Sequence, residues 1–355
     1  MPSLVALEAR GVRFADELRR AWDRGDAVLP VDPRLPRAAA DALVLAMRAG
    51  GEVAPGDALV VATSGTTGDP KGVVLTHANV AASAEASSAA LGVDPARHRW
   101  LACLPLAHVG GLSVVTRAWH TGTPLEVHDG FDPEAVDDAA RRGGTHVSLV
   151  GTALGRVDAG RWERILLGGS APPPDRPPNA VATYGMTETG SGVVYDGRPL
   201  AGVELHIVAG EVLVRGPMVA ARYRDGTPVV DAGGWLRTGD LGHLEDGVLS
   251  VHGRKGDVII TGGENVHPEP IERRLRAHPA IADAAVVGRP DPEWGQWVVA
   301  VVELAEGASP PALDEVRDWV RQVLPAWCAP KALEVRPLPR TSLGKVRRIE
   351  LREGP

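Results

Sequence analysis

The 355-residue chain has little of several features that mark particular classes of protein. Its two cysteines, Cys103 and Cys328, provide neither a disulfide framework nor a thiolate zinc site, which favours a reducing compartment. There are 38 basic and 45 acidic residues, and the net charge of −7 (38 − 45) argues against a nucleic-acid-binding surface. No uncharged apolar run reaches the roughly 18 residues of a membrane span, and Met1 to Arg10 lacks the apolar core of a signal peptide. We therefore expect a cytoplasmic protein without a membrane span or a nucleic-acid partner.

Aromatic side chains are also scarce, at 4% of the residues with three tyrosines, whereas hydrophobic residues as a whole reach 44%. The chain can therefore bury a large core, but that core must be built from Val, Leu, Ile and Ala. Its length suggests about two domains. The eleven histidines have no cysteine partners at ligand spacing and no H-E-x-x-H motif, which argues against a catalytic zinc.

Helical stretches and short apolar runs alternate along the first half of the chain. Residues 4–47 are predicted to form two helices, because Phe14 and Leu18 lie on one helical face. The apolar runs 59–62 and 73–75 are predicted strands on either side of a loop of small residues, and further short runs follow. This alternation predicts an α/β fold with buried strands.

The second half of the chain changes character twice. Beyond residue 197 it becomes strand-rich, with hairpin turns expected at Ala209-Gly210 and Asp246-Gly247. After residue 253 a helix with Glu early and Arg late is followed by strands and another helix, the pattern of a small α/β domain. We predict a large domain for nucleotide and acyl binding over residues 1–253, with α/β subdomains and a β-rich subdomain, a hinge near 253–256, and a small mobile domain over 257–355.

The most informative segment runs from Thr63 to Gly72 and reads T-S-G-T-T-G-D-P-K-G. Its glycines let backbone N–H groups approach a polyanion, its hydroxyls donate hydrogen bonds, and its lysine supplies a point charge. The spacing differs from that of the nucleoside-triphosphatase loop, because Pro70 stands five residues after Gly65. We predict a phosphate-binding loop of another kind, formed by Thr63, Ser64, Gly65, Thr66, Thr67, Gly68 and Lys71.

This loop resembles the phosphate loop of the adenylate-forming (ANL) superfamily, which includes acyl- and aryl-CoA synthetases, luciferases and peptide-synthetase adenylation domains. Further segments resemble the other motifs of the superfamily, in the same order. They are Tyr184 to Thr189 for adenine and magnesium, Trp235 to Asp240 for ribose, Gly253 to Asp257 with Gly262 to Val266 for the hinge and its adjoining loop, and Pro339 to Arg348 for a catalytic lysine. The resemblance implies an acetyl-CoA synthetase-like fold, in which the small C-terminal domain rotates about the hinge.

The resemblance also implies a role for each matching residue. Lys71 and the loop backbone would hold the β- and γ-phosphates, Glu188 would carry Mg²⁺, and Thr187 would donate to the α-phosphate. Lys345 would bridge the acyl oxygen and the α-phosphate, where negative charge develops in the transition state. The remaining contacts to nucleotide and coenzyme A are expected from Gly168, Gly169, Ser170, Tyr184, Gly185, Met186, Asp240, Arg254, Gly262 and Gly263.

Two positions bear on the substrates. The chain ends at Pro355 without a carrier module, so we expect free coenzyme A to be the acyl acceptor. Val109 follows His108 where amino-acid-activating relatives place an aspartate, so no carboxylate there would offset a substrate ammonium. His108 itself is predicted to be a gate or wall of the acyl site.

Residues 105–113 and 184–192, together with a short N-terminal portion, resemble the o-succinylbenzoate–CoA ligases of menaquinone biosynthesis. The resemblance implies that o-succinylbenzoate, ATP and coenzyme A give the acyl thioester, AMP and pyrophosphate, with Mg²⁺ as the cofactor. Arg117, His120 and Ser191 are candidates for binding the carboxylate that is not activated. Another aryl- or medium-chain acyl-CoA ligase is an alternative, and so is a catalytically silent nucleotide-binding protein of the same fold. The sequence leaves the oligomeric state open, a homodimer included.

Overall fold

The computed structural model describes residues 1–64, 70–169, 172–173, 175–340 and 346–353. Contacts within the chain divide it into two compact units. Unit 1 comprises residues 1–206, 213–237 and 244–249, and unit 2 comprises residues 207–212, 238–243 and 250–355. Two segments that precede residue 250, 207–212 and 238–243, therefore belong to unit 2. The hinge near residues 253–256 stays a prediction.

The first sheet of unit 1 has five strands in the order β1-β2-β3-β4-β14. β1 and β2 run parallel, as do β2 and β3, whereas β3 and β4 form an antiparallel hairpin and β14 pairs antiparallel with β4. Helices α1 and α2 alternate with its first strands. The bounds are β1 Leu4–Glu8, α1 Gly11–Asp23, β2 Ala27–Val31, α2 Arg37–Ala46, β3 Asp57–Ser64, β4 Pro70–Thr76 and β14 Arg222–Tyr223.

The prediction of two helices over residues 4–47 is incomplete. The helices α1 and α2 are present, but two parallel strands flank α1. Every residue of β2 is buried, although the sequence analysis did not include this five-residue run among the strands. The apolar run is short enough for a fully buried strand, and Pro30 within it pairs in register with Leu7 of β1.

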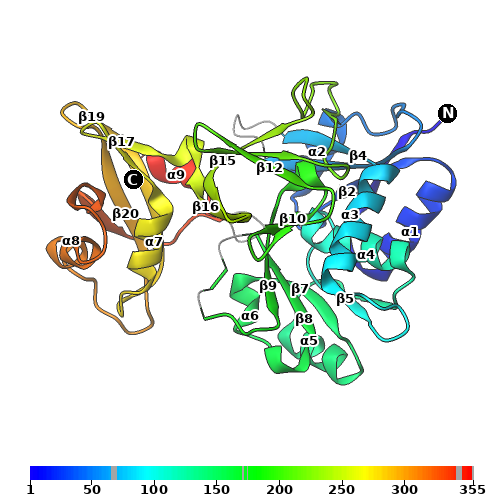
Figure 1. Ribbon diagram of the computed structural model, residues 1–355, viewed down its shortest axis with the longest axis horizontal. Helices are drawn as coiled ribbons and strands as arrows, with labels where there is room; N and C mark the ends of the chain where they lie inside the picture. The colour runs from blue at the N-terminus through cyan, green and yellow to red at the C-terminus, as the bar shows by residue number, and fades with distance from the viewer. Residues whose placement is uncertain (65–69, 170–171, 174, 341–345, 354–355) are drawn as a thin grey trace. The chain divides into compact units, whose positions relative to one another are not determined.

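A second, seven-stranded sheet has the order β11-β10-β9-β8-β7-β5-β6 (Figure 1). Its strands from β6 to β9 are parallel, as expected for buried α/β strands, and β10 and β11 are antiparallel additions. The bounds are α3 His77–Leu91, β5 Trp100–Ala102, α4 Val109–Thr121, β6 Leu125–Val127, α5 Pro133–Arg141, β7 His146–Val150, α6 Gly151–Leu154, β8 Arg164–Gly168, β9 Ala180–Gly185, β10 Gly192–Tyr195 and β11 Arg198–Pro199.

Local sequence explains where the helices beside this sheet begin and end. The Thr76 hydroxyl accepts from the backbone amide of Asn79, and the Asn79 side chain accepts from the backbone amide of Thr76, so a reciprocal capping box closes the N-terminus of α3. α3 ends at Gly92, which has the left-handed φ of 62° that favours glycine. Beneath the helices, Leu101, Val147 and Ile165 belong to a buried aliphatic core.

A third sheet has the order β12-β13-β15-β16, and its strands contribute residues to both units. Ala209 and Gly210 join β12 to β13 with φ values of 49° and 78°, and Asp246 and Gly247 join β15 to β16 with 49° and 74°. Two successive positive φ values are typical of tight hairpin turns, so both predicted turns are confirmed. The bounds are β12 Glu204–Val208, β13 Glu211–Arg215, β15 Leu236–Glu245 and β16 Val248–Arg254.

Unit 2 contains a fourth sheet in the order β18-β17-β20-β19, with β21 pairing alongside β20. Ile271 and Leu275 of α7 and Val316 and Val320 of α8 pack with its strands in one core, as the predicted small α/β domain requires. The bounds are β17 Ile259–Thr261, β18 Glu264–Val266, α7 Pro268–Arg276, β19 Ile281–Asp291, β20 Gly295–Leu304, α8 Leu313–Arg321, β21 Ala332–Val335 and α9 Arg348–Arg352.

Two further observations follow from this architecture. Among the described residues, no helix is both long enough and apolar enough to cross a membrane.

Cys103, next after β5, is 1% exposed, and its burial raises the pKa of the thiol to about 12. Burial also raises the pKa of the partly exposed Cys328 thiol. Both thiols are therefore protonated at neutral pH.

Candidate active site

The flanks of the predicted phosphate loop are held in register by two antiparallel strands. Thr63 of β3 pairs with Lys71 of β4, and Ser64 pairs with Pro70. The loop predictions Gly65, Thr66, Thr67 and Gly68 lie outside the described residues. The structure therefore places both ends of the loop on neighbouring strands, with Lys71 exposed at the start of β4.

Gly72 shows why a glycine follows this lysine. A Cβ atom at Gly72 would lie 2.5 Å from Sδ of Met47 and 2.8 Å from a methyl carbon of Val60. Both distances are too short for a side chain, and both neighbours are buried. The glycine thus lets β4 pack closely against the core immediately beside Lys71.

The predicted adenine and magnesium motif forms a tight turn at the end of β9. The amide of Met186 donates to the Thr189 hydroxyl, which itself contacts the carbonyl oxygens of Met186 and Ser191 at 2.9 and 2.7 Å. Thr189 is fully buried, and Gly190 has a left-handed φ of 67°. The short 3₁₀ helix η2 (Thr187–Thr189) makes up this turn, and Thr187 and Glu188 within it are partly exposed.

Two predicted segments follow neighbouring strands of the second sheet, which end at Gly168 and Gly185. β8 and β9 are parallel neighbours, so Gly168 at the end of β8 and Tyr184 and Gly185 at the end of β9 share the carboxyl edge. This edge is where open α/β sheets bind ligands. A Cβ at Gly185 would lie 2.2 Å from the Ser191 carbonyl oxygen, so the turn closes only with glycine. Gly169 follows with φ 92°, and Ser170 lies outside the described residues.

Glu188 and Lys71 meet at a residue that the sequence analysis missed. The hydroxyl of Tyr223 donates to Oε1 of Glu188 at 3.1 Å, and the Lys71 ammonium lies 5.3 Å from the centre of the Tyr223 ring. Burial, together with the negative charge of Glu188, raises the pKa of Tyr223 to about 12. One signal was available in the sequence, because Tyr223 is one of three tyrosines in the chain.

His108 stands at the start of α4, close to a carboxylate that the sequence analysis also missed. Its Nε2 lies 3.6 Å from Oδ2 of Asp32, a buried residue just after β2. The guanidinium of Arg34 donates to both Asp32 oxygens at 2.9 and 2.6 Å. These hydrogen bonds, with a smaller contribution from the charge of His108, lower the pKa of Asp32.

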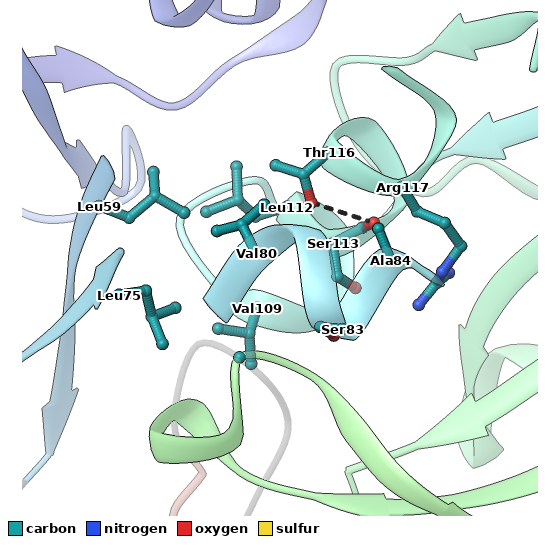
Figure 2. Close-up of a pocket in the computed structure, with 11 residues that line it drawn as sticks. Leu59, Leu75, Val80, Ser83, Ala84, Val109, Leu112, Ser113, Thr116 and Arg117 are labelled. Carbon is teal, nitrogen blue, oxygen red and sulfur yellow. Dashed lines mark hydrogen bonds between the residues drawn. The ribbon is translucent and has the colours of Figure 1, made fainter. Parts of the chain in front are cut away.

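A small pocket lies between α3 and α4 and is drawn in Figure 2. Its volume is about 10 Å³, room for about one water. Aliphatic side chains line one side, and Ser83, Ser113, Thr116 and Arg117 contribute polar groups. Ser191 contacts one of these lining residues, because its hydroxyl donates to the Ser113 hydroxyl at 3.1 Å.

The structure separates the three candidates for the second carboxylate. Arg117 is 1% exposed, its Nε donates to Ser87 at 2.7 Å, and its Nη1 has no hydrogen-bond partner within the described part of the chain. Its guanidinium also lies 4.9 Å from the centre of the Trp100 ring. His120, by contrast, pairs with Glu85 at 3.0 Å on the partly exposed side of α4. Arg117 is therefore the candidate that lines the pocket, whereas neither Ser191 nor His120 does, and Ser191 only donates a hydrogen bond to the lining residue Ser113.

In unit 2 the two residues predicted to bind ribose contact each other. Nε of Arg254 on β16 lies 2.8 Å from Oδ1 of Asp240 on β15. The Asp240 amide donates to the Thr238 hydroxyl, which donates in turn to the Val212 carbonyl oxygen at 2.7 Å. The Asp240 side chain is thus held in place by its own unit, with only 9% of its surface exposed.

The predicted coenzyme A loop is a tight turn between β17 and β18. Gly262 and Gly263 both have positive φ, 58° and 85°, a combination that favours glycine at both positions. A Cβ at Gly262 would lie 2.8 Å from the Trp294 ring, and the Gly262 amide donates to the Trp294 carbonyl oxygen. The sequence motif and the turn geometry agree here.

Lys345, the predicted catalytic lysine, lies outside the described residues, and the residues on either side of that segment make contacts within unit 2. Arg340 and Val346 form an isolated bridge, and the Arg347 amide donates to the Pro339 carbonyl oxygen at 2.7 Å. Arg348 then donates to both oxygens of Glu272 on α7 at 2.8 Å. This anchoring fixes both ends of the segment in unit 2.

The donor set of unit 1 suits one particular kind of metal ion. Among the described residues there is no group of three or more His, Cys, Asp or Glu side chains that could hold a metal ion. Mg²⁺ does not need such a cage, because it is bound through one or two carboxylates together with substrate phosphates and waters. Glu188, on a turn beside the phosphate-loop lysine, fits that requirement.

Comparison with known proteins gives two family matches and a group of similar sequences. The family of AMP-binding enzymes matches residues 16–224, and the family described as the C-terminal domain of AMP-binding enzymes matches residues 270–345. The probable 2-succinylbenzoate–CoA ligase of Mycobacterium tuberculosis is 39% identical over 340 residues, covering 88% of this chain and 88% of the relative. The 2-succinylbenzoate–CoA ligase of Geobacillus kaustophilus is 37% identical, covering 83% and 69%.

Solved structures give the same comparison at the level of the fold. The o-succinylbenzoate CoA synthetase (MenE) of Bacillus subtilis, in complex with the acyl-adenylate intermediate OSB-AMP, superimposes with a TM-score of 0.78 at 29% identity, covering 99% of this chain and 78% of that one. The same enzyme with ATP and magnesium gives 0.78 at 31% identity, covering 95% and 81%. The amide bond synthetase McbA of Marinactinospora thermotolerans gives 0.86 at 25% identity, covering 99% and 90%.

Proposed function

The chain belongs to the AMP-binding enzyme family, and from that premise we propose that it is an AMP-forming 2-succinylbenzoate–CoA ligase of menaquinone biosynthesis. In the first step the acid attacks the α-phosphate of ATP, which gives the acyl-adenylate and pyrophosphate. In the second step the thiol of coenzyme A attacks the acyl carbon, and AMP leaves. ATP and coenzyme A are thus co-substrates.

One observation carries the proposal beyond sequence similarity. The phosphate-loop lysine and the predicted magnesium carboxylate come from segments more than a hundred residues apart, yet Lys71 and Glu188 both contact Tyr223. The first reaction step brings a carboxylate to a triphosphate, so cations and fixed donors must gather around those phosphates. Unit 1 provides a cation and a magnesium-type ligand that contact the same tyrosine.

Each group then has a task in the first step. Lys71 and the loop backbone hold the outer phosphates, Thr187 donates to the α-phosphate, and Tyr184 lies against adenine. When bound to Glu188, Mg²⁺ would neutralise phosphate charge. From unit 2, Asp240 accepts from the ribose hydroxyls with Arg254 beside it, and Lys345 stabilises the charge that develops on the acyl oxygen and α-phosphate.

Arg117 is our choice for the carboxylate that is not activated. Its guanidinium is almost fully buried, and Nη1 has no partner among the described residues. A buried donor of this kind costs free energy unless a ligand satisfies it, and a carboxylate is the matching acceptor. The pocket beside Arg117 has room for about one water, so we assign it to the far end of the acyl site only. His108, held near Asp32, would form another wall.

The second step needs a path for the thiol of coenzyme A. We assign the turn at Gly262 and Gly263 to that path, since its backbone has no Cβ to obstruct a narrow pantetheine chain. A hinge near 253–256 would let the small domain withdraw Lys345 after the adenylate has formed. The site is a small-molecule site for an acid, ATP and coenzyme A, and the cytoplasm is the compartment we propose for it.

The test is pyrophosphate release measured across a panel of acids, with thioester formation measured in parallel. We expect 2-succinylbenzoate to give the highest kcat/KM, with benzoate and octanoate well below it. Equal or better turnover of benzoate or octanoate would contradict the narrow assignment and favour another aryl- or medium-chain acyl-CoA ligase. ATP binding without pyrophosphate release for any acid would favour the silent nucleotide-binding protein. Amines belong among the acceptors tested, because a protein of similar fold is an amide bond synthetase.

A further inference from the structure

Tyr223 is the residue at which the predicted phosphate-binding and magnesium-binding groups of unit 1 meet, and the proposed function gives it no task. We propose that Tyr223 is a positioning residue that orients Glu188 and Lys71 toward the phosphates of ATP. This inference rests on the proposed function, because it takes the nucleotide roles of Glu188 and Lys71 from it.

The backbone around Tyr223 is anchored by its two neighbours. Arg222 donates to both oxygens of Asp57 at 2.8 Å, and the Asp57 side chain is 3% exposed. Arg224 donates from its amide to the Gly72 carbonyl oxygen at 2.7 Å and from its guanidinium to the carbonyl oxygen of Met47. The contacts of these two arginines hold the backbone immediately before and immediately after Tyr223. The ring therefore stands on a fixed base.

The strand register explains why the ring meets Lys71. Tyr223 of β14 lies opposite Val73 of β4. Lys71 precedes Val73 by two residues, and side chains two residues apart on a strand share a face. The Lys71 ammonium accordingly lies 5.3 Å from the ring centre, within the range of a cation–π contact. The ring limits where this long, exposed side chain can point.

Glu188 is held by the same short segment at two points. The Ala220 amide donates to the Glu188 carbonyl oxygen at 2.8 Å, and the Tyr223 hydroxyl donates to the carboxylate at 3.1 Å. The first contact fixes where the side chain begins, and the second fixes where it points. A tyrosine hydroxyl is a neutral donor, so the full negative charge of Glu188 remains available to a cation.

The experiment compares ATP binding with and without magnesium, measured by isothermal titration calorimetry on the whole chain and without any acid. The wild-type protein should bind ATP more tightly with magnesium than with EDTA. Tyr223→Phe should lower the magnesium-dependent affinity about tenfold, the size of a hydrogen bond to a charged group, and leave the affinity in EDTA unchanged. The matched control is Tyr195→Phe, which removes the hydroxyl of a buried tyrosine from β10 and should change neither affinity.

Two further variants separate positioning from general structure. Glu188→Gln should also lose the magnesium effect, and the double variant with Tyr223→Phe should lose no more, because both changes remove one interaction. Additive losses would overturn the proposal, as would an equal loss with and without magnesium in Tyr223→Phe, or no loss at all.

Tyr223→Leu tests the contact with Lys71, because it removes the ring as well as the hydroxyl. It should weaken ATP binding about threefold even in EDTA, as expected for loss of an exposed cation–π contact. An unchanged affinity in EDTA would overturn the Lys71 part of the proposal. The calorimetry involves no acid, so a failure of the proposed ligase reaction would appear separately, as missing acid-dependent pyrophosphate release.

Discussion

The two units of the molecule treat their functional carboxylates differently. In unit 1, Glu188 accepts a hydrogen bond from the neutral hydroxyl of Tyr223. In unit 2, Asp240 meets the guanidinium of Arg254, and Glu272 meets that of Arg348. A neutral donor leaves the charge of a carboxylate available to a cation, whereas an arginine offsets it. The contrast applies to these three carboxylates and not to every carboxylate of a unit, because Asp57 of unit 1 is also paired with an arginine. Glu188 keeps its charge available to a cation, whereas Glu272 holds a segment of unit 2 in place and Asp240 combines such a pairing with its proposed ribose contact.

Lys345→Ala should have the largest effect, because it removes a charge that unit 2 is proposed to bring to the reaction. We expect adenylate formation to fall by about a thousandfold, as for loss of a major electrostatic stabiliser of a transition state. Conversion of supplied acyl-adenylate to thioester should be retained. Single-turnover assays of the two half-reactions check this, and equal loss in both would refute the division of labour.

Glu272→Gln sharpens the comparison from the structural side. The Glu272 carboxylate is 3% exposed and accepts from Arg348 and from the Val286 amide. Breaking this buried pair leaves Arg348 with only its longer contact among the described residues, to Asp257 at 3.5 Å, so we expect a loss of about 3 kcal/mol in the free energy of unfolding. Urea unfolding of the purified protein measures it. The control is Asp314→Asn on α8, whose carboxylate is 88% exposed and which should change stability little.

Asp240→Asn addresses both sides of the contrast, since Asp240 is paired with Arg254 and is also proposed to bind ribose. We expect the KM for ATP to rise about tenfold, because an amide is a weaker acceptor than a carboxylate for two hydroxyls. Steady-state kinetics over a range of ATP concentrations measure the change. If Arg254→Gln, which leaves the carboxylate in place, raises KM more than Asp240→Asn, the arginine and not the aspartate is the main ribose contact.

The smallest effect is expected for Asp32→Asn in unit 1: the variant should be less stable than the wild type at neutral pH, and this difference should shrink in acid. The hydrogen bonds from Arg34 lower the pKa of folded Asp32, so this group contributes stability above its unfolded pKa, about 3.9. That contribution is lost as the pH falls through the lower, folded pKa. The variant should therefore lose less stability than the wild type between neutral pH and about pH 3, measured by urea unfolding at each pH. If the free energies of unfolding of the variant and the wild type fell by the same amount over this pH range, the result would contradict the proposed contribution of the Asp32 carboxylate.

The sequence predicted the family, the α/β class and both hairpin turns, because these depend on local patterns of glycine, apolar residues and motif order. The family assignment is confirmed by the matches to both AMP-binding families. The first strands were missed, since the buried run of β2 is short and its Pro30 reads as a break in the chain. Nucleotide roles for the site residues remain predictions.

Tyr223, Asp32 and Arg34 escaped prediction for another reason. Two of them have a partner far away in sequence: Tyr223 contacts Glu188, 35 residues before it, and Asp32 lies near His108, which is several elements later in the chain. Arg34 was missed together with Asp32, its partner two residues away. The two distant pairs depend on strand register and on helix placement, which no single segment encodes. The motif residues were found because their function imposes a local spacing, whereas their supports need only a shared position in space.

The two protonated thiols have a practical consequence for an enzyme that makes a reactive acyl intermediate. An acyl-adenylate is open to nucleophiles, and the reactive form of a cysteine is the thiolate, whereas burial raises the pKa of Cys103 and Cys328 and so favours the less reactive thiol form. Neither side chain competes with the incoming acceptor for the acyl group. Cys103, which is 1% exposed, should in addition react with a maleimide dye more slowly than a cysteine introduced on the surface of unit 1.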